Sequence, residues 1–73
     1  MKYIIFIQDE TGKHFLVGEY FKLEDSIDDV NNILVRYGSY VDELNLEKDK
    51  TVLKYLMTEK GIISVRGFEL NNS

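Results

Sequence analysis

The sequence has no cysteine, no proline and no tryptophan, and it has one histidine among its 73 residues. Without cysteine the chain forms neither a disulfide framework nor a thiolate metal site. Its longest apolar run, Tyr3–Ile7, is much shorter than the ~20 residues of a membrane-spanning helix. The run is also too short for the core of a signal peptide. We therefore expect a cytoplasmic protein without a membrane partner.

Few residues are available for catalysis. His14 is the only histidine, and a general base needs a positioned partner in a pocket. A nucleophilic triad is hard to assemble without cysteine or a second histidine. The five glycines are scattered singly, so no phosphate-binding loop is present. We expect no catalytic residue, no cofactor and no enzymatic activity.

Charge is distributed unevenly along the chain. The net charge is −4, with −5 in residues 1–43 and +1 in residues 44–73. An acidic first half argues against binding to nucleic-acid phosphates, which relies on Lys and Arg. The content of 44% apolar and 30% charged residues suits one folded domain over residues 1–73. Abundant Ile, Lys, Glu and Asn are typical of an AT-rich bacterial or phage genome.

The first half predicts a β-hairpin. Residues 2–8 are rich in β-branched and aromatic side chains, and a second such run extends over residues 13–21. Between them, Asp9-Glu10-Thr11-Gly12 suits a bulged turn with glycine at positive φ. We expect Ile7 opposite Phe15 and Ile5 opposite Val17.

A helix is predicted over residues 26–37, where apolar residues recur at three- and four-residue steps. Ser26 is the expected N-cap, and Gly38 suits the end of the helix. Four acidic residues favour the positive N-terminal end of the helix dipole: Glu24, Asp25, Asp28 and Asp29. They lack the pattern of a calcium loop, so we interpret them as solvated and expect no metal site.

The second half admits two interpretations. Residues 61–70 resemble a closing strand, whereas Thr51–Met57 fits either a strand or a helix. The strand interpretation makes a three-strand meander from Asp42, with a turn at Glu47–Lys50, and it is slightly favoured. The alternative places a second helix at residues 50–58. Either way the fold class is α+β, with an N-terminal hairpin, one amphipathic helix and further strands.

Residues 1–38 carry a local resemblance. The order of predicted elements is an N-terminal strand, a turn that ends Thr11-Gly12-Lys13, a second strand, and a helix that opens at Asp25-Ser26-Ile27. This half of the chain resembles the opening of a ubiquitin-like β-grasp domain. The resemblance implies a β-grasp-like fold but no conjugation, because the chain has no Gly-Gly tail. Fold alone does not imply function.

The two faces of the hairpin point to a binding surface. Alternation places Tyr3, Ile5, Ile7, Phe15 and Val17 under the helix. The other face then carries Ile4, Phe6, Leu16 and Tyr20, with Glu24, Asp25, Asp28 and Asp29 as an acidic rim. Contiguous exposed apolar patches often mark binding sites. Three alternatives remain for this face: a cover formed by residues 50–57, a homodimer interface, or a docking site for another protein.

We therefore expect a small acidic protein that acts by protein–protein binding, as an inhibitor, an adaptor or a small structural subunit. One alternative is an acidic decoy that mimics nucleic acid and blocks a DNA- or RNA-binding protein. Another is a self-assembling homodimer with no foreign partner. A last candidate is a single-strand-binding surface built from Lys48, Lys50, Lys54, Lys60 and Arg66 with Tyr55 and Phe68. Five cations over thirty residues are ordinary, so the sequence argues against nucleic acid as a partner.

Overall fold

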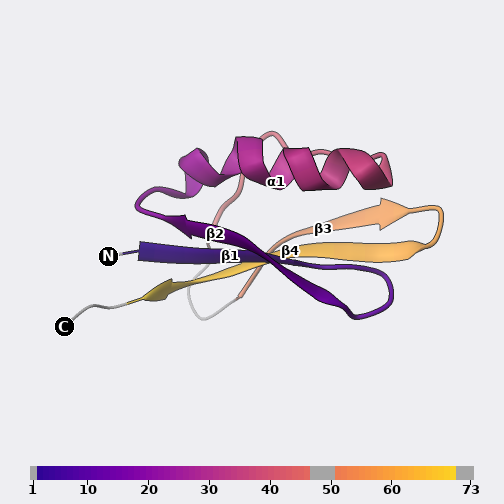
Figure 1. Cartoon of the computed structure of the whole chain (residues 1–73), viewed down its shortest axis with the longest axis horizontal. Coiled ribbons are helices and arrows are strands. Elements are labelled where there is room, and N and C mark those ends of the chain that lie inside the picture. The colour runs from indigo at the N-terminus through magenta and orange to yellow at the C-terminus, as the bar shows by residue number, and fades with distance from the viewer. Residues whose placement is uncertain (1, 47–50, 71–73) are drawn as a thin grey trace.

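One four-stranded antiparallel sheet carries a helical layer on one face (Figure 1). The computed structural model describes residues 2–46 and 51–70. Its strands are β1 (Lys2–Gln8), β2 (His14–Tyr20), β3 (Val52–Thr58) and β4 (Gly61–Leu70). A continuous helical segment comprises η1 (Leu23–Ser26), α1 (Ile27–Leu34) and η2 (Val35–Tyr37). The α+β class and the order of hairpin, helix and further strands are confirmed.

The β1–β2 turn is organised by the side chain of Asp9. Its Oδ1 accepts hydrogen bonds from the Thr11 N–H at 2.9 Å, the Thr11 hydroxyl at 2.6 Å and the Lys13 N–H at 3.0 Å. The bond from the Thr11 hydroxyl is the main cause of a lowered pKa of Asp9. Gly12 has φ 90°, as the turn prediction requires. The carboxylate and the glycine together fix the path of the turn.

The hairpin register contains a bulge that the sequence prediction missed. Ile7 pairs with Phe15 as expected, but Ile5 pairs with Gly18 and not with Val17. Val17 is the extra residue of a β-bulge, which shifts all later positions of β2 by one. Tyr20 therefore pairs with Tyr3 and packs against the core on the helical side. The predicted placement of Tyr20 on the opposite face is wrong for this reason.

The helical segment starts earlier than predicted and ends as predicted. Ser26 already has helical backbone angles and makes no capping bond, because η1 precedes it. Its hydroxyl instead donates to the Leu23 carbonyl at 2.6 Å. Gly38 has φ 73°, and the Ser39 N–H donates to the Leu34 carbonyl at 3.1 Å. Ser26 is the residue before α1, as predicted, but it lacks the expected capping hydrogen bond; the stop at the glycine is confirmed.

The second half forms a two-stranded hairpin. β3 confirms the strand interpretation of Thr51–Met57, and the alternative helix at residues 50–58 is wrong. The meander from Asp42 is also wrong, since residues 42–46 are not a strand. In this connection Val41 and Leu44 are both buried, at a spacing that strand alternation does not allow. The predicted turn at Glu47–Lys50 lies outside the described residues.

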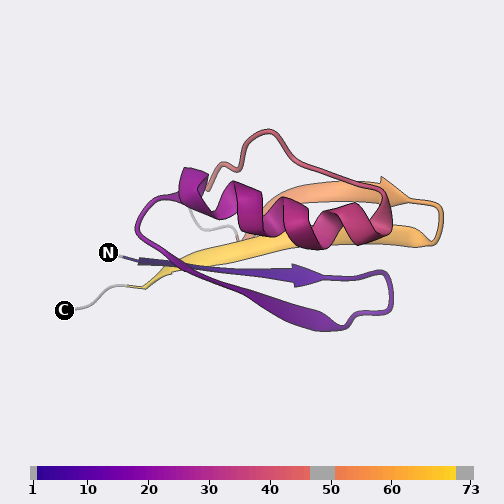
Figure 2. The ribbon, with the colours of Figure 1, turned by 45° about the horizontal axis from the view of Figure 1, so that its top comes forward.

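The core lies between the helical layer and one face of the sheet, whose strand order is β2-β1-β4-β3 (Figure 2). Asn31 fixes the connection after the helix: its Nδ2 donates to the Val41 carbonyl at 2.9 Å, and its Oδ1 accepts from the Val41 N–H at 2.8 Å. The buried apolar residues come from both layers and from this connection. They are Ile5, Ile7, Val30, Leu34, Val41, Leu44, Ile63 and Val65.

Candidate interface on the open face of the sheet

We call the face of the sheet opposite the helix the open face. Three rows of side chains cross the strands at its centre, between the Lys2–Leu70 pair at one end and the Met57–Ile62 pair at the other. The middle row joins Leu16, Phe6, Arg66 and Val52, from β2, β1, β4 and β3 in turn. The two flanking rows are Glu19–Ile4–Phe68 and His14–Gln8–Ser64–Tyr55. Antiparallel alternation places these residues on one side, because their neighbours Ile5, Ile7, Ile63 and Val65 point into the core.

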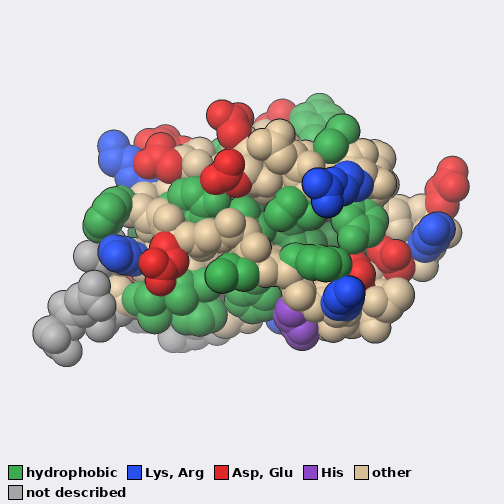
Figure 3. All heavy atoms as spheres, in the orientation of Figure 1, with side chains coloured by type: hydrophobic (Ala, Val, Ile, Leu, Met, Phe, Trp, Pro, Cys, Tyr) green, Lys and Arg blue, Asp and Glu red, His purple; other side chains and the backbone are tan. Residues whose placement is uncertain are grey.

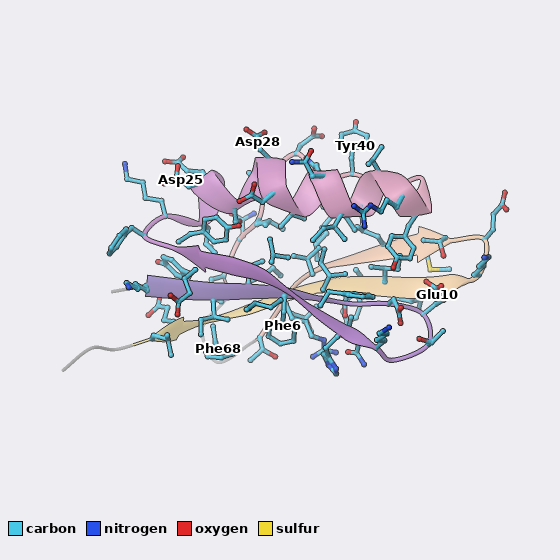
Figure 4. The ribbon with its side chains drawn as sticks, in the orientation of Figure 1. Phe6, Glu10, Asp25, Asp28, Tyr40 and Phe68 are labelled. Atoms are coloured by element: carbon cyan, nitrogen blue, oxygen red, sulfur yellow. The ribbon has the colours of Figure 1, made fainter. Side chains whose placement is uncertain are left out.

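Large apolar side chains of the open face are accessible to solvent. Leu16 is 70% exposed, Tyr55 63% and Phe68 38%. The ring of Phe6 lies at the centre, 6.3 Å from the Phe68 ring in an edge-on arrangement and 5.7 Å from the His14 ring. Figure 4 shows Phe6 and Phe68 projecting from the sheet away from the helix. The aromatic rings form a cluster that no described helix covers.

Arg66 is the charged group at the centre of the open face. It pairs with Phe6 on β1 and with Val52 on β3, and its Nε donates to the Ser64 hydroxyl at 3.1 Å. Glu19, on the edge strand β2, is the only acidic residue in the three rows. The centre of the face is therefore apolar and positively charged, although the whole chain is acidic.

The structure brings together three of the four predicted patch residues. Ile4, Phe6 and Leu16 lie on the open face, whereas Tyr20 lies under the helix. The predicted acidic rim is elsewhere. Its exposed carboxylates belong to η1 and α1 in the other layer, and Figure 4 shows Asp25 and Asp28 on the far side of the sheet from Phe6. The acidic rim is Glu24, Asp25, Asp28 and Asp29.

Asp29 links the acidic group to the hairpin. The Tyr20 hydroxyl donates a hydrogen bond to its Oδ2 at 2.6 Å. Burial of the phenol is the first cause that raises the pKa of Tyr20 to about 12, and the bond and charge of Asp29 add to the effect. Both residues thus hold the helix on the edge strand, which is a structural role.

The predicted basic and aromatic surface is not assembled. Tyr55, Phe68 and Arg66 share the open face, but Lys54 pairs with Val65 on the helical side and Lys60 lies in the β3–β4 turn. Lys48 and Lys50 lie outside the described residues. The edge-on packing of Phe6 and Phe68 also differs from the flat platform on which bases stack.

The remaining candidates are His14, a metal site and a membrane-spanning helix. His14 is exposed and contacts Phe6, as a surface histidine. Within residues 2–46 and 51–70, no three His, Asp or Glu side chains are grouped to hold a metal ion. In the same part of the chain, no helix has the length and apolar character needed to cross a membrane.

Comparison with known protein families, curated proteins and solved structures finds no match to this chain. No finding therefore bears on the resemblance of residues 1–38 to the ubiquitin-like family.

Sequence reasoning missed the contribution of the second hairpin to this face. Along β4, core residues alternate with Phe68, Arg66 and Ser64, and this two-residue period is visible in the sequence. The sequence does not show that these side chains join the hairpin face, because β4 pairs with β1 at the centre of the sheet and no local pattern indicates that pairing.

Proposed function

We propose that this protein acts by binding another protein through the open face of its sheet. One observation carries the proposal: a contiguous apolar surface spans all four strands, and no described helix covers it. Aromatic residues and arginine, which dominate the centres of protein interfaces, occupy the centre of this surface. A small protein of this kind acts as an inhibitor, an adaptor or a small structural subunit, in the cytoplasm.

Charge favours a different protein over a second copy as the occupant. In a two-fold pair of open faces centred on Phe6 and Arg66, two guanidinium groups approach each other across an apolar contact. Like charges in such a position cost several kcal/mol. Glu19 lies at the edge strand, away from the middle row. The fitting partner is an apolar protein surface that offers a carboxylate to Arg66.

The first experiment compares baits that differ at one exposed apolar residue. Leu16→Ser removes a side chain of the open face, and Val35→Ser removes one of similar exposure, 68%, on the helical layer. A true partner is captured by the wild type and by Val35→Ser and is lost with Leu16→Ser. Capture that is the same with both variants would contradict the proposal.

The second experiment uses the identified partner in purified form. Arg66→Glu should weaken the complex by about 2 kcal/mol or more, roughly thirtyfold in Kd, because a carboxylate then faces a carboxylate. Light scattering of the protein alone should give the mass of a monomer. A dimer that Leu16→Ser dissociates would overturn the choice of a foreign partner and favour self-association.

The helical layer favours a second candidate function. Glu24, Asp25, Asp28 and Asp29 are all exposed there, and Figure 3 shows acidic side chains gathered over the helical segment. Such a surface suits an acidic decoy that occupies a nucleic-acid-binding groove. The two functions differ in their response to salt: a decoy complex weakens steeply as salt rises, and an apolar one does not.

A further inference from the structure

A hollow lies at one end of the molecule, where three segments converge. Its lining comes from the β1–β2 turn, from the end of the helical segment and from the β3–β4 turn. Figure 4 shows Glu10 between the two hairpins, beneath the C-terminal end of the helix. The hollow has a volume of about 770 Å³, within the ~300–1,000 Å³ range of small-molecule sites.

The hollow collects charges of both signs. Glu10 and Glu59 bring carboxylates, and Arg36 and Lys60 bring cations. Tyr37, Ser39 and Thr58 add hydroxyl groups, and Met57 adds an apolar wall. A ligand with a single charge meets repulsion from half of these groups. A ligand with one positive and one negative end matches the lining.

Glu10 supplies the strongest sign of a missing partner. Its Oε2 is buried and accepts no hydrogen bond from any residue that the structure describes, Arg36 and Lys60 included. Its backbone and Cβ are held in place from two sides. Asp9 fixes the turn just before it, and the backbone of Gly61 lies against it, since a Cβ at Gly61 would be 3.1 Å from the Glu10 Cβ. A buried carboxylate oxygen without a donor costs free energy that a cationic donor would recover.

From this arrangement we propose that the hollow binds a small molecule that carries both an ammonium group and a carboxylate group, such as an amino acid or a short peptide. The ammonium group donates to the Glu10 carboxylate, which turns about its last side-chain torsion to present an oxygen to the hollow. The carboxylate of the ligand is bound by Arg36, whose planar guanidinium can donate two parallel N–H bonds to it, and Lys60 is a second cation nearby. Any apolar side chain of the ligand rests on Met57 and Tyr37. This site is separate from the middle row of the open face.

The probes are leucine, the dipeptide leucylglycine, and two fragments of leucine. Isoamylammonium lacks the carboxylate, and isocaproate lacks the ammonium group. Each is titrated into the ¹⁵N-labelled full chain, with the backbone amides of Ser39, Thr58 and Lys60 as reporters. Leucine or the dipeptide should give saturable shifts, and each fragment should bind about tenfold more weakly or less well. The tighter of the two zwitterions identifies the source of the ligand.

Variants test the assigned contacts. Glu10→Gln keeps the size of the side chain and should weaken leucine binding about tenfold, as should Arg36→Gln at the other end of the ligand. Glu24→Gln, which removes an exposed carboxylate outside the hollow, should leave binding unchanged, as should Leu16→Ser on the open face. The proposal is overturned if neither zwitterion gives saturable shifts. It is also overturned if isoamylammonium binds as tightly as leucine, or if both Glu10→Gln and Arg36→Gln bind leucine like the wild type.

Discussion

The hydroxyl of Tyr20 and the carboxylate of Asp29 are joined by a hydrogen bond of 2.6 Å, which ties the edge strand β2 to the first turn of α1. Tyr20 reaches the helix because the bulge at Val17 turns the end of β2 toward it. The bond therefore depends on the register shift that sequence reasoning did not foresee.

Loss of this bond should destabilise the fold by a small amount. Tyr20→Phe keeps the packed ring and removes the hydroxyl, so the free energy of unfolding should fall by about 1 kcal/mol. Urea unfolding of the two proteins measures the change. Tyr40→Phe, which alters an exposed tyrosine, serves as the control and should change stability less. Equal effects of the two substitutions would contradict the role of the Tyr20 hydroxyl.

The same pair predicts an alkaline transition. The folded pKa of Tyr20, about 12, lies above the ~10 of an unfolded tyrosine. The stabilisation by its neutral phenol is thus complete below pH ~10 and is lost as pH rises through the folded value. The tyrosinate absorbance should show a late step near the folded pKa that Tyr20→Phe removes and Tyr40→Phe retains. A titration curve without that step in the wild type would disprove the assignment.

Asn31 should be among the most sensitive polar positions. Its amide satisfies both the N–H and the carbonyl of Val41, so Asn31→Ala leaves two backbone groups without partners. We expect a loss of about 1–3 kcal/mol in unfolding free energy. Asn32→Ala, at the neighbouring exposed position of α1, is the matched control and should be close to neutral. Comparable losses at both positions would show that helix propensity, and not the Val41 bonds, sets the effect.

Gly67 should not tolerate a side chain. A Cβ there would lie 2.7 Å from Ile5 Cδ1 and 2.9 Å from the Ile4 carbonyl oxygen, and the oxygen belongs to a central strand that cannot move away. Gly67→Ala should therefore cost about 1–3 kcal/mol of stability. Thermal unfolding beside Glu69→Ala, an exposed position on the same strand, provides the comparison. A melting temperature for Gly67→Ala equal to that of Glu69→Ala would refute the predicted clash.

The predictable parts of the fold are those that local chemistry determines. The turn at Asp9–Gly12 and the stop at Gly38 need glycine at positive φ, and the local sequence has a glycine at each of these two positions. The bulge at Val17 was not predictable from alternation, because alternation assigns one partner to every residue. The choice of strand for residues 52–58 depends on pairing with β4, a contact between segments that local periodicity leaves undecided.

The candidate interface was predicted in part for the same reason. Ile4, Phe6 and Leu16 were identified because they belong to a hairpin whose turn fixes its own register. Phe68 and Arg66 were not joined to them, since that step requires the long-range pairing of β1 with β4. The hollow around Glu10 was out of reach as well, because its lining comes from three separate turns and ends of elements.

The central position of β1 and β4 also affects how the protein folds while it is being synthesised. β1 is synthesised early, but its partner on one side, β4, comes from residues 61–70. Until those residues leave the ribosome, one edge of β1 is unpaired and the helix lacks Ile63 and Val65 beneath it. Pairings between such distant segments form slowly, because a long loop must close first. The sheet and the helical layer therefore become stable only once residues 61–70 can pair with β1, and the apolar hairpin is prone to aggregation until then.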